Sequence, residues 1–146
     1  MITKTIYVAC AILLLVACGS SKKNTTEVHI QLENITWNIT QVDEIKVSDL
    51  KPNKVPSFTL TSESHRITGN SGCNQFGGGY TFENNVLTTS KMFSTEMACI
   101  GLMELEQKIN TAFNQPLTLK TEGAQTMLTS ADGKTVMKIS AQVAGK

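Results

Sequence analysis

Residues 69–80 of this 146-residue chain read Gly69-Asn70-Ser71-Gly72-Cys73-Asn74-Gln75-Phe76-Gly77-Gly78-Gly79-Tyr80, and this stretch decides the fold. It places five glycines, one cysteine and two aromatic residues in a single short run. Glycine has no Cβ atom, so it reaches positive φ angles and lets two backbones approach closely. A second cysteine follows in Thr95-Glu96-Met97-Ala98-Cys99. We expect a mostly β domain built around these two segments.

The N-terminus carries the pattern of an export signal. Lys4 is followed by an uncharged apolar run from Ile6 to Ala17, which is the layout of a secretory signal peptide. This run is shorter than the roughly 20 residues of a membrane-spanning helix. It ends in Leu15-Val16-Ala17-Cys18-Gly19, which resembles the lipobox of bacterial lipoproteins, where cleavage before the cysteine is coupled to its acylation. An ordinary signal peptide with a chance cysteine is the alternative.

The lipobox predicts how the chain is divided and where it is located. Residues 1–17 are predicted to be a lipoprotein signal peptide, residues 18–29 the lipidated Cys18 and a polar tether, and residues 30–146 the folded domain. Two or more acyl chains anchor a protein stably to a membrane. We therefore expect a lipid-anchored protein of the cell envelope. The absence of an acidic residue at Gly19 favours the outer membrane.

Alternation of apolar and polar residues predicts short β-strands, each with one buried face. The expected strands are Val28–Leu32, Ile35–Ile39, Phe58–Leu60, His65–Thr68, Tyr80–Phe82, Val86–Thr89 and Leu117–Leu119. Asp132-Gly133 is a strong hairpin signal. A two-residue loop there would place Leu128 opposite Met137. Trp37, the one tryptophan, is expected in the core.

One helix is expected among these strands. Apolar residues recur from Leu102 to Phe113 at helical spacing, and Asn114-Gln115-Pro116 ends the pattern because proline cannot continue a helix. Regularly spaced strands with turn signals favour an antiparallel sheet that curls or closes. The predicted fold class is therefore α+β: an antiparallel, curled or partly closed β-sheet with one main helix packed on it.

Two of the four cysteines, Cys73 and Cys99, lie outside the signal segment. An isolated pair in an exported protein most often forms a disulfide, because the compartment is oxidising. Two buried thiols that do not react are the alternative. A catalytic cysteine would require His65 beside one of these thiols as a base, and nothing local in the sequence demands that arrangement.

Other chemistry receives little support. The possible metal ligands Cys73, Cys99, His29 and His65 are scattered, whereas zinc sites use clustered ligands. The glycine run lacks the ending of a phosphate-binding loop. The net charge of +1 argues against a nucleic-acid surface. We predict no catalytic residue, no metal, no cofactor and no nucleic-acid partner.

Two motifs carry a resemblance to a known family. Residues 72–80 are similar to the pattern Gly-Cys-Asn-x-aromatic-x-Gly-x-Tyr, and residues 95–99 to Thr-x-Met-Ala-Cys, which precedes a helix like the one expected here. The chain thus resembles the META domain family, which includes the HslJ-like heat-shock proteins, from about Leu32 to Ile139. Family members are often envelope lipoproteins linked to stress response. The resemblance implies an α+β domain and no catalytic residues, and Glu96 departs from the basic residue often found before the methionine.

These observations predict a non-enzymatic, membrane-anchored envelope lipoprotein with a stress-response or interaction role. Its partners would be the membrane, through the lipid anchor, and an envelope protein, and we expect a monomer. The alternative function is a binding module for a small ligand or peptide. The residues of its candidate binding rim are Gly72, Asn74, Gln75, Phe76, Gly78, Tyr80, Thr95 and Met97.

Overall fold

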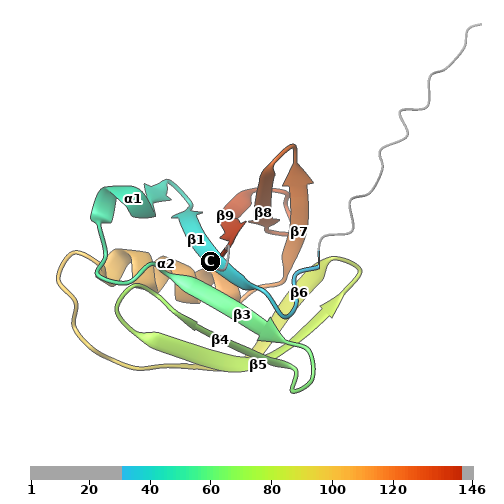
Figure 1. Ribbon diagram of the computed structural model, residues 1–146, viewed down its shortest axis with the longest axis horizontal. Helices are drawn as coiled ribbons and strands as arrows, with labels where there is room; N and C mark the ends of the chain where they lie inside the picture. Colours follow the sequence, from blue (N-terminus) through green and yellow to red (C-terminus); the bar gives the residue numbers. More distant parts are fainter. Residues whose placement is uncertain (1–30, 143–146) are drawn as a thin grey trace, which may run out of the picture.

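Strands dominate the computed structural model, which describes residues 31–142 (Figure 1). The strands are β1 (Thr36–Val42), β2 (Ile45–Lys46), β3 (Ser57–Thr61), β4 (Arg66–Asn70), β5 (Gln75–Glu83), β6 (Val86–Ser94), β7 (Leu117–Glu122), β8 (Gln125–Thr129) and β9 (Thr135–Ala141). The helices are α1 (Val47–Leu50) and α2 (Met103–Phe113). The predicted signal peptide, Cys18 and the tether lie outside the described residues.

The strands close into an antiparallel barrel. In the sheet order β2-β1-β3-β4-β5-β6-β7-β8-β9, each strand pairs with its neighbour, and β1 also pairs with β9. Trp37 lies opposite Ala141 and Ile39 opposite Ile139 at this closing seam. The short strand β2 pairs only with β1, so the other eight strands form the barrel. Figure 1 shows β1 and β9 meeting near the centre of the view.

The predicted α+β fold class is therefore wrong, because the sheet is a fully closed barrel and α2 is a short insertion between β6 and β7. The closing pair joins strands from the two ends of the described chain. Alternation within a strand indicates which face is buried, but it does not identify the strand that pairs with each edge. The pairing of β1 with β9 thus has no local signal in the sequence.

Helix α2 lies along the part of β6 that pairs with β5 on one side but has no strand on the β7 side. Strands β6 and β7 share only two residue pairs, Val86 with Thr118 and Leu87 with Leu117. Farther along β6, the Thr89 hydroxyl donates to the carbonyl of Phe113, and the Ser94 hydroxyl donates to Glu106 Oε1 at 3.4 Å. The buried face of α2 consists of Leu105, Ile109, Ala112 and Phe113. The predicted helix is confirmed, and its apolar stripe completes the core.

Two further local predictions are confirmed. Trp37 is buried, and its Nε1 donates to the carbonyl of Leu32 at 2.9 Å. Leu128 pairs with Met137, as the hairpin signal predicted. The connection is longer than two residues, however, because a register shift follows Leu128 and the loop spans residues 130–134. The first expected strand is not formed at Leu32, and the earlier part of that strand lies outside the described residues.

The described part of the chain contains a complete core. Its buried apolar side chains extend from Leu32 to Ile139, and the disulfide between Cys73 and Cys99 lies within the same range. A unit with its own core can fold on its own, so residues 30–146 can be studied as an isolated domain. No helix within residues 31–142 is long and apolar enough to cross a membrane.

Candidate functional site

The glycine-rich stretch forms the end of β4, a tight turn and the start of β5. Ser71 N donates to the carbonyl of Asn74 at 2.8 Å, and Gly72 N donates to Asn70 Oδ1 at 3.0 Å. Gly72 has a φ of +93°, a backbone conformation that favours glycine. Gly78 serves a different purpose, because a Cβ atom there would lie 2.8 Å from the carbonyl oxygen of Ser90 on β6. This glycine allows β5 and β6 to approach closely.

Asn74 is the centre of a buried hydrogen-bond network. Its side chain is 1% exposed. Oδ1 accepts hydrogen bonds from Thr95 Oγ1 at 2.7 Å and from Met97 N at 2.8 Å. Nδ2 donates to the carbonyl of Met97 at 2.9 Å and to Glu106 Oε2 at 2.8 Å. One side chain thus joins the β4–β5 turn to the segment after β6 and to helix α2. We call residues 95–101 the linking segment.

The disulfide between Cys73 and Cys99 holds the same two parts of the chain together. The two Cα atoms are 6.1 Å apart, and the closed loop spans a sequence separation of 26 residues. The predicted pairing is confirmed, and the alternative of two unreacted thiols is excluded. A cysteine in a disulfide is not available as a nucleophile, and β4 separates His65 from Cys73. The catalytic alternative with His65 as base therefore has no support.

The predicted binding rim is divided between the interior and the surface. Phe76 and Tyr80 are buried, at 3% and 4% exposure. The ring of Phe76 packs against that of Phe113 on α2, with centroids 5.4 Å apart. The exposed members are Gln75, Thr95 and Met97. Because both aromatic rings lie in the core, they cannot line an open ligand surface.

Tyr80 carries a perturbed titratable group. Its hydroxyl donates to Glu33 Oε1, which lies just before β1. Burial, together with this hydrogen bond and the nearby negative charge, raises the pKa of Tyr80 above its ordinary value. The tyrosine therefore stays neutral and donates a hydrogen bond, which suits a structural role.

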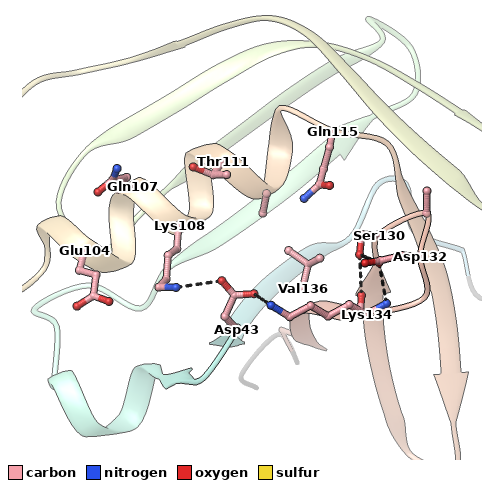
Figure 2. Close-up of a pocket in the computed structure, with 12 residues that line it drawn as sticks. Asp43, Glu104, Gln107, Lys108, Thr111, Gln115, Ser130, Asp132, Lys134 and Val136 are labelled. Carbon is pink, nitrogen blue, oxygen red and sulfur yellow. Dashed lines mark hydrogen bonds and ion pairs between the residues drawn. The ribbon is translucent and has the colours of Figure 1, made fainter.

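A groove that the sequence did not reveal lies between α2 and the β8–β9 hairpin. Its volume is about 740 Å³, and Figure 2 shows the side chains that line it. Most of them are polar or charged. They are Asp43, Glu104, Gln107, Lys108, Thr111, Ala112, Gln115, Ser130, Ala131, Asp132, Lys134 and Val136. The sequence predicted the helix and the hairpin that form its two sides, but nothing in it indicated that they enclose a groove.

Asp43 organises the charges of the groove (Figure 2). Its carboxylate forms ion pairs with Lys108 Nζ at 3.1 Å and with Lys134 Nζ at 3.5 Å. On the other side, Asp132 accepts hydrogen bonds from Ser130 Oγ and from Lys134 N. The hydrogen bond from Ser130 is the main reason that the pKa of Asp132 is lowered. Three elements are thereby joined: the β1–β2 turn, α2 and the hairpin.

The groove has the features of a binding surface. Its volume is in the range of small-molecule sites, but those sites are mostly apolar, whereas this lining is mostly polar and charged and suits a polar ligand. No cysteine or histidine lines it, and two of its three carboxylates, Asp43 and Asp132, are engaged by Lys108, Lys134 and Ser130. Within residues 31–142, no group of three or more His, Cys, Asp and Glu side chains is placed to hold a metal ion. The arrangement can bind a polar ligand, and binding of a small ligand or peptide stays a prediction.

The ion pair at Asp43 predicts a loss of stability at alkaline pH. The hydrogen bond to Asp43 is the main cause of the raised pKa of Lys108. Because folding raises this pKa, the ion pair stabilises the folded state fully at pH values below the pKa of an unfolded lysine, about 10.4. The stabilisation is lost as the pH rises through the pKa of Lys108 in the folded state. We expect Asp43→Asn to lower the urea midpoint at neutral pH and to approach wild type at high pH.

Urea unfolding at neutral and alkaline pH measures this effect. Asp49→Asn is the matched control, because the carboxylate of Asp49 accepts a hydrogen bond from the adjacent Ser48 and lies outside the groove. It should show the pH dependence of wild type. If the urea midpoints of Asp43→Asn and wild type differed by the same amount at both pH values, the ion pair would not be the source of the pH dependence.

Comparison with known proteins gives a family and a fold. Residues 30–143 match the family model described as META domain. An NMR structure of a protein from Burkholderia xenovorans is similar, with a TM-score of 0.60 and 18% identity over 77% of this chain and 85% of that chain. A second protein solved by NMR has a TM-score of 0.59 and 23% identity over 74% of this chain and 90% of its own. A comparison with curated proteins gives no match. At these identities the solved structures show the fold alone.

Proposed function

The chain belongs to the META domain family, and from this premise we propose that it is a non-enzymatic, lipid-anchored envelope protein of the HslJ-like kind. It acts by binding a partner, in the stress response of the cell. The observation that carries the proposal is the disulfide between Cys73 and Cys99. Structural disulfides form and persist in oxidising compartments outside the cytosol, which agrees with the export pattern at Ile6–Ala17.

The lipid anchor is supported by the sequence around Cys18. The lipobox-like Leu15-Val16-Ala17-Cys18 places a thiol where an acylated N-terminus would be generated, and a polar tether follows. Dual acylation suffices for stable anchoring. With Gly19 after the cysteine, the outer membrane is the proposed location. The domain itself is proposed to act as a monomer.

The non-enzymatic character is supported by the roles of the motif residues. Asn74 satisfies its hydrogen-bonding groups within the fold, and Cys73 is bonded to Cys99. The residues that look most like a site therefore hold the structure together. No buried side-chain N or O atom lacks a hydrogen-bond partner in the described part of the chain, which is consistent with a structural role for its buried polar groups.

The replacement Cys18→Ala tests the anchor and the role that depends on it. Wild-type protein is expected in the membrane fraction, with an N-terminal mass that includes acyl chains. The variant should lack this mass and leave the membrane, since one residue carries the whole anchor. Affinity capture from envelope extracts of heat-stressed cells should enrich an envelope protein with wild type only.

Cys10→Ala is the matched control, because Cys10 lies inside the apolar run and is not followed by the tether. It should leave fractionation, mass and capture unchanged. If Cys18→Ala stays acylated and membrane-bound, the anchor assignment fails. If wild type and Cys18→Ala capture the same set of proteins, the interaction role fails while the anchor stands.

A further inference from the structure

A second pocket lies on the outer surface of the barrel, between α1 and the seam where β1 meets β9. Its volume is about 430 Å³. The apolar side chains that reach it are Val47, which is 6% exposed, and Val55, which is 53% exposed, whereas Ile39 is 0% exposed and lies beneath its floor. Figure 1 shows α1 standing beside β1, on the side of the barrel where the chain passes from β2 toward β3. The apolar surface of this pocket therefore comes from α1 and from the segment before β3, and the barrel strands contribute polar side chains.

The closing seam shapes this pocket. The register between β1 and β9 shifts between Ile39 and Gln41, so Thr40 is an extra residue on β1. Its hydroxyl donates to the carbonyl of Lys138 at 3.1 Å, which fixes the irregularity. Bulges of this kind bend a strand and re-aim its side chains. The β1–β9 seam thus contributes residues from both strands to one concave surface.

The charges around this pocket have one sign. Lys46 and Lys138 are the charged residues that line it, and no carboxylate does. Ser48 and Gln125 add hydrogen-bonding groups. Ligand pockets typically measure a few hundred Å³ and combine an apolar lining with a few placed polar groups. An apolar surface bordered by two ammonium groups is complementary to an apolar chain that ends in an anion.

We propose that this pocket binds a single-chain amphiphile with an anionic headgroup, of the fatty-acid class. The alkyl chain lies against Val47 and Val55, and the carboxylate is held by Lys46 and Lys138. Each methylene removed from water contributes about 0.8 kcal/mol, so the length of the chain determines affinity. The proposal concerns the folded domain only and does not depend on the lipid anchor at Cys18.

Calorimetric titration of the isolated domain, residues 30–146, with decanoate at monomeric concentrations tests the proposal. Decanoate is expected to bind at one site per chain. Octanoate, shorter by two methylenes, should bind about fifteenfold more weakly, which corresponds to about 1.6 kcal/mol. Decyltrimethylammonium, with the same chain and the opposite charge, should bind at least tenfold more weakly than decanoate.

Variants locate the site. Lys138→Glu and Lys46→Glu should each weaken decanoate binding about tenfold, and Val55→Asp should abolish it. Lys46 and Val55 are exposed, so both replacements leave the core intact. Lys120→Glu on the exposed face of β7 is the charge-matched control and should bind as wild type does.

Three outcomes would overturn the proposal. The first is no binding of decanoate by a folded domain. The second is equal binding of the anionic and cationic amphiphiles, or equal loss in Lys120→Glu. The third is concentration-dependent self-association of the domain that Val55→Asp prevents, because a second copy would then be the occupant of the pocket.

Discussion

Replacing Asn74 by alanine is expected to lower the free energy of unfolding by about 3 to 4 kcal/mol. The side chain makes four hydrogen bonds, two with the backbone of Met97 and one each with Thr95 and Glu106. A typical hydrogen bond contributes about 1 kcal/mol net, and a buried partner left unsatisfied costs more. Alanine would remove all four bonds and leave a space at a site that is almost fully buried.

Urea unfolding of the isolated domain measures this loss. Asn53→Ala is the matched control, because Asn53 is exposed and its side chain makes no hydrogen bond within the part of the chain that the structure describes. Surface replacements of this kind usually change stability by less than about 0.5 kcal/mol. A loss below about 1 kcal/mol for Asn74→Ala would mean that the network has no central role.

Removing the disulfide is expected to have an effect of similar size. In the chain-entropy relation, a loop of 26 residues corresponds to about 3.5 kcal/mol of stabilisation. The double replacement Cys73→Ser and Cys99→Ser should lower the free energy of unfolding by roughly this amount. The linking segment would then be held to this part of the chain by Asn74 and by the two hydrogen bonds between Gln75 and Thr95.

Reduction of the wild-type domain provides the matched comparison, since it breaks the same bond without changing a side chain. Reduced wild type and the double variant should unfold at closely similar urea concentrations. Mass spectrometry of the unreduced domain should count no reactive thiol. A double variant as stable as the oxidised domain would show that the disulfide does not restrain the unfolded chain.

The sequence predicted the features that depend on neighbouring residues. Apolar alternation located most strands, the stripe from Leu102 to Phe113 located α2, and the hairpin signal predicted the pair of Leu128 and Met137. The pairing of Cys73 with Cys99 followed from their number and from the export pattern. Each of these features is indicated by a pattern among neighbouring residues or, for the disulfide, by the number of cysteines outside the signal segment.

The remaining features depend on contacts between distant segments. Barrel closure joins β1 to β9, and no residue pattern names that partner. The groove of Figure 2 requires Asp43, Lys108 and Lys134 to meet from three separate elements. The same applies to the motif, where polar and aromatic residues beside glycines suggested a rim. Asn, Phe and Tyr have the same sequence pattern in an exposed rim and in a buried network.

The glycine-rich motif clamps the linking segment onto the β4–β5 turn, and amide hydrogen exchange at Met97 measures this restraint residue by residue. Met97 N donates to Asn74 Oδ1 at 2.8 Å. The neighbouring amides of Glu96 and Ala98 donate no hydrogen bond within the described residues. We expect a slowly exchanging Met97 amide between two fast ones, with its protection lost in Asn74→Ala. Exchange of Met97 as fast as that of Glu96 and Ala98 in the wild-type domain would contradict this expectation.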